Sequence, residues 1–306
     1  MITPQNGIFA QGTHAHYFLE LDIRNIAPER VLKSFRRFRA PDVSAGGINF
    51  VLAFGSDFWS SICGANENFQ EPAGLTPFSE IHGAGGKHVP AQQHDAWIWI
   101  NGSTPDVAFD HARAAWLSVR DVATLATELA CFVYRDSRDL TGFIDGTANP
   151  EPLDAPNVAL IPTGLPGGGG SHVLVMRWVH DLDAFHAQPV PDQERVFGRK
   201  KPDSIELDSD QMPANAHIAR VQVMDGGSEL EIYRRSVPYG TVAEHGLYFV
   251  AFSADRTRFD RMLARIFGNS EDGLRDHLTD FSRPVSGAYY FAPSLTALRE
   301  LEAEVG

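Results

Sequence analysis

The chain has 306 residues, enough for one large domain or two domains of ordinary size. Hydrophobic residues make up 43% and charged residues 21%, a globular composition that excludes a wholly disordered chain. The formal net charge of −13 argues against a protein that follows nucleic-acid phosphates or docks on an anionic membrane.

Cysteine usage and the N-terminus predict the compartment. The two cysteines, Cys63 and Cys131, form no CxxC pair, so neither a disulfide framework nor a cysteine-based zinc site is expected. No apolar run reaches the length of a membrane span, and the first residues lack the pattern of a secretory signal. We therefore expect a cytoplasmic protein with neither membrane nor nucleic acid as a partner.

The first half of the chain predicts alternating strands and helices. Residues 16–23 alternate as a strand does, and residues 28–38 favour a helix with Val31, Leu32 and Phe35 on one side. A buried strand is expected at residues 49–54 and another strand at 96–100. A long helical stretch is expected at residues 107–125.

The second half follows a stretch at residues 149–171 that is rich in proline and glycine and has the composition of a linker. Strands are expected at residues 172–179 and 247–252, and a helix at 257–267 that ends at Gly268. The segment from residue 213 to 223 indicates a loop that leads into an alternating strand, and a further strand is expected around Arg234.

The order of these elements predicts an α+β fold. The halves resemble each other weakly, and each has a β-α-β-β-α-β-like order, which indicates two ferredoxin-like halves with antiparallel sheets and peripheral helices. We expect the halves to comprise residues 1–150 and 151–306.

Three features have the residue types of a chemical site. His217 lies at an expected strand mouth, where one imidazole nitrogen can face a cavity; a structural histidine is the alternative. Asp145 stands between Gly142 and Gly146 in a loop that lets backbone approach a ligand, although an Asp-Gly turn is common. Arg234 lies next to another arginine on a strand, so the two point to opposite faces. A surface pair is the alternative there.

The remaining histidines give weaker signals. His14 and His16 lie two apart on an expected strand and so share a face that can bind a metal, or form an exposed strand end. His82, His88 and His94 lie in or beside a glycine-rich loop and match no standard zinc pattern.

Together these segments resemble the dye-decolourising peroxidases, most closely the B-type bacterial subfamily. The resemblance rests on GFIDGTANP, on the histidine in NAHIARV, and on RRSVPYG followed by HGLYFVAF, and it extends over essentially the whole chain. It implies two ferredoxin-like halves that form a dimeric α+β barrel-like fold. Non-covalent haem b is then held mainly by the C-terminal half.

The resemblance also implies roles for the residues of the proximal and distal sides. His217 matches the axial ligand of the haem iron, and Asp276 is the candidate acceptor for its second nitrogen. Asp145 and Arg234 match the distal aspartate and arginine. Ser236 occupies a distal position where many B-type relatives have asparagine.

Further residues are assigned to the cofactor pocket with less specific signals. Arg199 is a candidate partner of a haem propionate, because guanidinium pairs well with carboxylate. Phe252 and Phe267 are expected to line the apolar haem cavity, although ordinary core packing explains each equally well.

The implied activity is reduction of hydrogen peroxide through an oxoferryl intermediate, with dyes, phenolics or other one-electron donors oxidised in turn. The ordinary pKa of an aspartate is about 3.9, and a neighbouring Arg234 lowers such a pKa, so Asp145 is expected to act as a base in mildly acidic solution.

Alternative functions stay open at this point. One alternative is a non-enzymatic haem carrier on the same fold, which needs neither Asp145 nor Arg234. Another is a non-haem metal protein that uses His14, His16 and another histidine. The C-terminus has no evident docking tail for an encapsulin shell, and the sequence is compatible with a closed homo-oligomer.

Overall fold

The structure is a computed structural model, and it describes residues 2–36 and 47–304. Strands in these ranges form one antiparallel ten-stranded sheet in the order β10-β12-β11-β6-β1-β5-β2-β14-β7-β13. Because β12 pairs with β7 as well as with β11, the sheet closes on itself as a barrel. The strands of the sheet are β1 (Ala15–Ile23), β2 (Asn49–Phe54), β5 (Ala96–Gly102), β6 (Ala123–Phe132), β7 (Ser171–His180), β10 (Tyr233–Arg234), β11 (Val237–Gly240), β12 (His245–Ser253), β13 (Ser282–Pro284) and β14 (Ala288–Ala292).

Aromatic and branched side chains fill the inside of the barrel. One core cluster takes buried residues from every strand of the ring, including Phe18 of β1, Trp97 and Trp99 of β5, and Tyr248 and Phe252 of β12. Side chains alternate between the two faces of a strand, so the residues between them point outward. The barrel interior is therefore a packed core.

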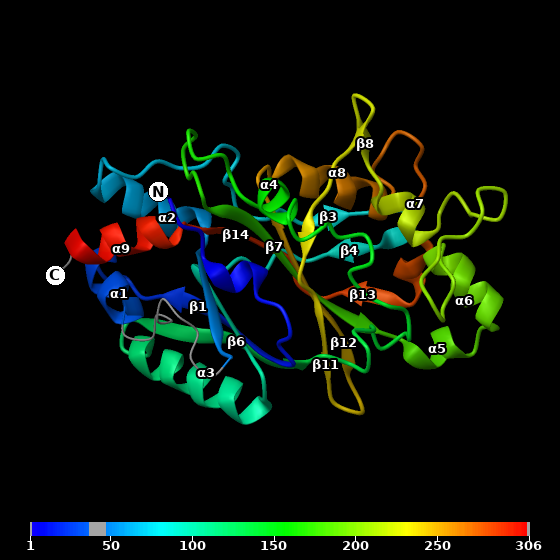
Figure 1. Cartoon of the computed structure of the whole chain (residues 1–306), viewed down its shortest axis with the longest axis horizontal. Helices are drawn as coiled ribbons and strands as arrows, with labels where there is room; N and C mark the ends of the chain where they lie inside the picture. Colours follow the sequence, from blue (N-terminus) through cyan, green and yellow to red (C-terminus); the bar gives the residue numbers. More distant parts are fainter. Residues whose placement is uncertain (1, 37–46, 305–306) are drawn as a thin grey trace.

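Helices cover the outer face of each half (Figure 1). The outward residues of β5 join a cluster under α1, α2, α3 and α9, while those of β7, β12 and β14 join a cluster under α7 and α8. No helix among the described residues combines the length and apolar character that a membrane span requires. The helices are α1 (Pro28–Phe35), α2 (Ser56–Ala65), α3 (Pro105–Val119), α4 (Ala155–Ala159), α5 (Leu182–His186), α6 (Val190–Phe197), α7 (His217–Val221), α8 (Thr257–Ile266) and α9 (Leu295–Glu304), with short 3-10 turns η1 (Asn6–Phe9), η3 (Ala84–Gly86) and η4 (His277–Asp280).

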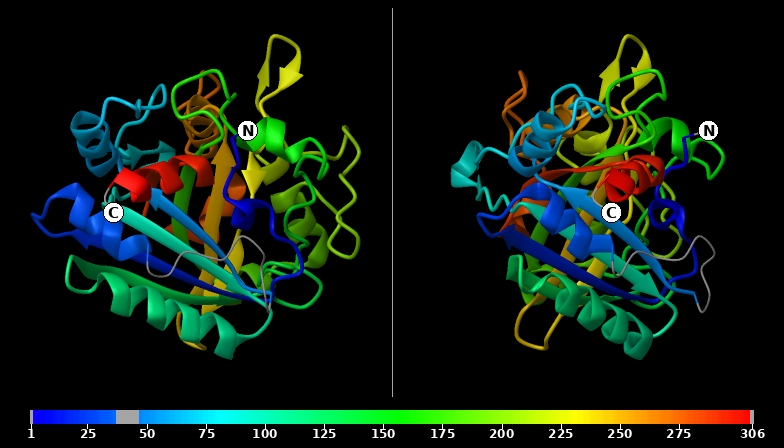
Figure 2. Two further views of the ribbon diagram at one scale, coloured as in Figure 1. Left: turned by 60° about the vertical axis from the view of Figure 1, so that its left-hand side comes forward. Right: turned by 90° about the vertical axis from the view of Figure 1, so that its left-hand side faces the viewer.

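Two small hairpins extend this framework. The β3–β4 hairpin (Ile81–His82 and His88–Val89) packs on the second half, because the Ala84 amide donates to the Phe267 carbonyl at 2.8 Å. The β8–β9 hairpin (Met224–Asp225 and Ser228–Glu229) stands away from the body in both views of Figure 2 (yellow).

Most predicted elements of the fold are confirmed, including the strand at 49–54 and the helix that ends before Gly268. The helix expected at 107–125 is wrong at its C-terminal end. Helix α3 ends at Val119, the Val122 amide donates back to the Val119 carbonyl at 2.9 Å, and β6 follows. Of the helix expected at 28–38, α1 reaches Phe35, and residues 37 and 38 lie outside the described residues.

The two predicted halves share one barrel. Strand β14 of the second half pairs with β2 of the first, and α9 lies beside α1 (Figure 1). The segment predicted as a linker contains helix α4, in which Ala155 and Ala159 are buried. A division at residues 150 and 151 stays a prediction.

A buried carboxyl group lies inside the barrel, where the halves meet. Glu20 accepts hydrogen bonds from the Tyr248 hydroxyl at 3.1 Å and the Tyr290 hydroxyl at 2.7 Å, and Trp97 donates to Tyr248 at 3.1 Å. Burial raises the pKa of Glu20, against the lowering effect of the two tyrosine bonds.

This raised pKa predicts a pH dependence of stability. The folded state keeps a proton on Glu20 that the unfolded chain releases, so the free energy of unfolding falls as pH rises from the ordinary to the raised pKa. Between those two values the fall is about 1.4 kcal/mol for each unit of pH. Urea unfolding at a series of pH values measures this slope, and Glu20→Gln should remove the contribution of Glu20 to it. The exposed Glu29→Gln control should keep it, and an unchanged slope in Glu20→Gln would contradict this account.

Candidate active site

A cavity lined mainly by apolar side chains lies outside the barrel, between the outer face of β7 and β12 and the helices α7 and α8. The space between its walls, including the open mouth, is about 1240 Å³. Its apolar walls include Leu174, Met176, Phe249, Phe259, Met262 and Leu263. Polar side chains from several separate segments also line it.

His217 lines this cavity as the first residue of α7. The strand expected here is wrong, because the segment forms a helical turn. Arg220, which is 1% exposed, donates to both carboxylate oxygens of Asp272 at 2.7 and 2.9 Å and to the Arg265 carbonyl at 3.2 Å. These distant partners hold the short helix, and the local alternation of the sequence gives no sign of them.

Asp276 accepts a hydrogen bond from His217. The His217 Nδ1 lies 2.7 Å from the Asp276 Oδ2, and Asp276 is 1% exposed. The other carboxylate oxygen of Asp276 accepts from the Leu278 amide at 2.8 Å at the start of η4. With Nδ1 bound in this way, Nε2 is the ring nitrogen left for the cavity.

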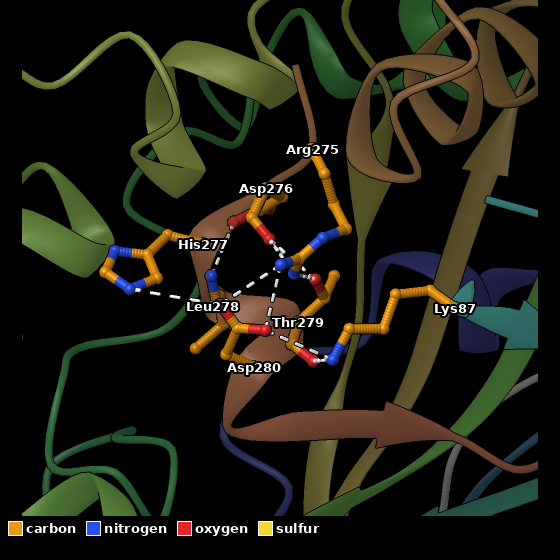
Figure 3. A network of polar contacts seen from close by, with 7 residues as sticks. All are labelled: Lys87, Arg275, Asp276, His277, Leu278, Thr279 and Asp280. Carbon is orange, nitrogen blue, oxygen red and sulfur yellow. Dashed lines mark hydrogen bonds and ion pairs between the residues drawn. The ribbon is translucent and has the colours of Figure 1, made fainter. Parts of the chain in front are cut away.

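Further polar contacts hold the Asp276 turn in place (Figure 3). The Thr279 hydroxyl donates to the Asp276 carbonyl at 2.6 Å, and Arg275 donates to that hydroxyl and pairs with Asp280 at 2.9 Å. Lys87, from the hairpin of the first half, donates to the Thr279 carbonyl at 2.7 Å. Contacts from both halves of the chain therefore hold Asp276, which accepts the hydrogen bond from His217, in place.

Asp145 reaches the cavity from a glycine-flanked loop. Gly142 and Gly146 have φ values of +92° and +76°, which side chains disfavour. The Asn149 side chain donates to the Arg234 carbonyl at 2.9 Å and accepts from the Arg234 amide at 2.8 Å. This pair of bonds ties the loop to β10, so Asp145 and Arg234 line the same cavity.

Burial controls the charge of this pair. It raises the pKa of Asp145, and Asp139 adds to the rise, while Arg234 acts in the opposite direction. The expectation that Arg234 places this pKa below its ordinary value is therefore wrong in direction, because desolvation outweighs the attraction. Burial lowers the pKa of Arg234, against the attraction of Asp145.

A second carboxylate in the cavity wall was missed by the sequence analysis. Asp139 pairs with the His180 Nε2 at 3.1 Å and accepts from the Thr141 amide at 2.9 Å, and the His180 Nδ1 lies 2.8 Å from the Ser282 hydroxyl. Although burial raises the pKa of Asp139, His180 and Thr141 together lower it to about 2. His180 and Asp139 lie 41 positions apart, so no local pattern in the sequence joins them.

The other predicted pocket residues divide between cavity and core. Arg199 and Ser236 line the cavity. Arg199 pairs with Glu206 at 2.7 Å, and the Ser236 hydroxyl accepts from the Val250 amide at 3.3 Å. The prediction that Phe252 lines the cavity is wrong, because strand alternation turns its side chain into the barrel core. Leu247 and Phe249 of the same strand line the cavity instead. Likewise, Phe267 stacks on Trp178 in the core.

Arg234, in β10, and Arg235, directly after it, point in different directions, as expected. Arg235 points away from the cavity. Its guanidinium lies 5.2 Å from the Trp99 ring and donates a hydrogen bond to the Ile8 carbonyl.

The predicted pair of His14 and His16 does not form a metal site. His16 is buried, its Nδ1 accepts from the Trp99 indole at 3.0 Å, and burial lowers its pKa to about 3. His14 is exposed.

Comparisons with known proteins agree with this geometry. The models "Dyp-type peroxidase, N-terminal" and "Dyp-type peroxidase, C-terminal" match residues 5–132 and 136–297. The dye-decolorizing peroxidase of Rhodococcus erythropolis is 34% identical over 261 residues, which cover 84% of this chain and 74% of that protein. The one from Mycobacterium tuberculosis is 35% identical over 256 residues, which cover 82% of this chain and 75% of that protein.

Solved structures show the same fold. A dye-decolorizing protein from V. cholerae superposes with a TM-score of 0.87 at 34% identity, over 97% of this chain and 99% of that chain. A variant of DypB from Rhodococcus jostii RHA1 in complex with heme gives a TM-score of 0.87 at 31% identity, over 96% of both chains. The family models, the curated relatives and the shared fold together show that this chain belongs to the dye-decolourising peroxidases.

Proposed function

We propose that this chain is a haem-dependent peroxidase that reduces hydrogen peroxide and oxidises dyes, phenolics or other one-electron donors. The observation that carries the proposal is a single cavity lined by an imidazole, a carboxylate and a guanidinium, from His217, Asp145 and Arg234. These groups supply what peroxide cleavage needs: a ligand for iron, an acceptor for a proton and a positive charge.

The residues of the cavity fit haem b. The apolar walls from β7, β12 and α8 suit a porphyrin, and the Nε2 of His217 is free to bind iron because Asp276 occupies Nδ1. A carboxylate that accepts from the second nitrogen fixes the tautomer and raises the basicity of such a ligand. Arg199 can share its charge between Glu206 and a propionate.

Asp145 and Arg234 have different roles in the reaction with peroxide. Bound haem supplies the iron that binds peroxide and the redox chemistry that follows. Asp145 takes the proton from one peroxide oxygen and returns it to the other, so that water can leave. Arg234 stabilises the negative charge that develops during this transfer. Ser236 lines the same cavity, where its hydroxyl can contact peroxide or an ordered water.

Replacement of Asp145 should change both rate and pH profile. Asp145 must lose its proton to act as a base, and burial raises its pKa, so the rate with peroxide should fall as pH drops through this raised value. Asp145→Asn should react about 10²–10⁴-fold more slowly and lose this acidic limb. Stopped-flow absorbance across acidic and neutral pH measures both effects. An acidic limb that persists in Asp145→Asn would assign the proton transfer to another group.

Replacement of the two neighbouring arginines should have different effects. Arg234→Leu removes a positive charge from the cavity and should lower the rate constant with peroxide by about 10²–10³-fold. Arg235→Leu removes the contact with Trp99 and should lower stability, with the peroxide rate unchanged. Equal loss of rate in the two variants would contradict a specific role for Arg234.

His217 and Asp276 should control the haem spectrum. His217→Ala should lose either haem itself or the absorption bands typical of histidine ligation. Asp276→Asn should weaken haem retention or activity by about 10–100-fold, as is usual for partners of ligating histidines. His277→Ala, which alters an exposed neighbour, is the control and should behave as the wild type. A wild-type spectrum in His217→Ala would exclude this histidine as the ligand.

One experiment separates the enzyme from a haem carrier. Haem-loaded protein is mixed with one equivalent of hydrogen peroxide in a stopped-flow spectrometer, and a dye is then added. A fast spectral change that the dye reverses supports the peroxidase, and a spectrum that peroxide barely alters supports the carrier. The cytoplasmic location and homo-oligomer formation stay predictions.

A further inference from the structure

A cluster of histidine and carboxylate side chains lies on the β3–β4 hairpin, apart from the candidate active site. Glu80, His82 and His88 place one ligand atom each within 4.8 Å of the others. Their side chains are 53%, 77% and 44% exposed, so a cation can reach them from solvent. Among the described residues, this is the group of at least three potential ligands that meets this distance.

The distances in the cluster match those around a small metal ion. The Nε2 atoms of His82 and His88 each lie 3.6 Å from the same oxygen of Glu80, Oε2. Zinc binds imidazole nitrogen and carboxylate oxygen at about 2.0–2.2 Å, so two ligands of a tetrahedral ion lie about 3.3–3.6 Å apart. The two distances to Glu80 lie at the upper end of this range, and all three ligand atoms lie within 4.8 Å of one another.

The backbone holds the two histidines face to face. His82 and His88 are paired residues of the antiparallel hairpin, and their rings stack at 5.0 Å with an interplanar angle of 19°. The Gly83 amide donates to the Lys87 carbonyl at 2.7 Å and closes the turn between them. Paired positions bring side chains together regardless of the residues that separate them in sequence.

Contacts with the second half restrain the hairpin. The Asn269 side chain donates to the His82 carbonyl at 3.1 Å, and Lys87 donates to the Thr279 carbonyl and pairs with Asp280 at 3.2 Å (Figure 3). Val89, next to His88, is fully buried. Ligands on a restrained backbone lose little conformational freedom when a metal binds.

From this geometry we propose that Glu80, His82 and His88 form a binding site for a divalent transition-metal ion, of which zinc is the representative. Two imidazoles and one carboxylate suit such ions better than Mg²⁺ or Ca²⁺, which prefer oxygen ligands. Three protein ligands leave the fourth tetrahedral position to water. The site is independent of the haem cavity, since none of its ligands lines that cavity.

Isothermal titration of the full-length, haem-loaded protein with Zn²⁺ tests the proposal. The wild type should show one site that His82→Gln, His88→Gln and Glu80→Gln each weaken at least about tenfold. His14→Gln, which removes an exposed histidine elsewhere, is the matched control and should leave this site intact. An unchanged haem spectrum in each variant shows that the fold is preserved.

Zinc-edge X-ray absorption supplies a second readout that does not depend on affinity. The wild type should give imidazole scattering from two histidines, and His82→Gln should give it from one. Equal titrations for the wild type and the three hairpin variants would overturn the proposal. So would a zinc spectrum without imidazole ligands.

Discussion

Strand β12 carries apolar side chains on both faces, and both the barrel and the cavity depend on this. Tyr248, Val250 and Phe252 point into the barrel and pack against the aromatic residues of the first half. Leu247 and Phe249 point the other way and form a wall of the cavity. The period of two in a β-strand makes these sets inseparable, since a shift of one residue would exchange them. Core packing thus holds the cavity wall in register.

The cavity wall contains two carboxylates, Asp139 and Asp145, in opposite electrostatic environments. Asp139 accepts from Thr141 and pairs with His180, which lowers its pKa to about 2. Asp145 has no comparable set of partners among the described residues, and burial raises its pKa. Asp139 therefore stays charged near neutral pH, while Asp145 can exchange a proton. Such a separation of pKa values is how sites assign acid and base roles.

Local patterns predicted much of this molecule, and long-range contacts explain the failures. The strand at 49–54 and the helix before Gly268 follow from periodicity and a glycine cap, both local properties. Helix α7 depends on the buried Arg220 and on partners about fifty positions away. Phe252 was assigned to the wrong face because β12 carries apolar residues on both faces, so its sequence shows no polar alternation. The hairpin partners His82 and His88 match no zinc spacing because strand pairing joins them.

The order in which the chain is synthesised restricts when this site can form. The loop with Asp145 is made early, but its partner Arg234 comes 89 positions later (234 − 145), and Asp276 later still. Strand β14, which joins β7 to β2, ends at Ala292. A nascent chain that emerges from the ribosome N-terminus first therefore cannot close the barrel before Ala292 has been made. A cavity with all of these groups in place accordingly forms only after the second half has been synthesised.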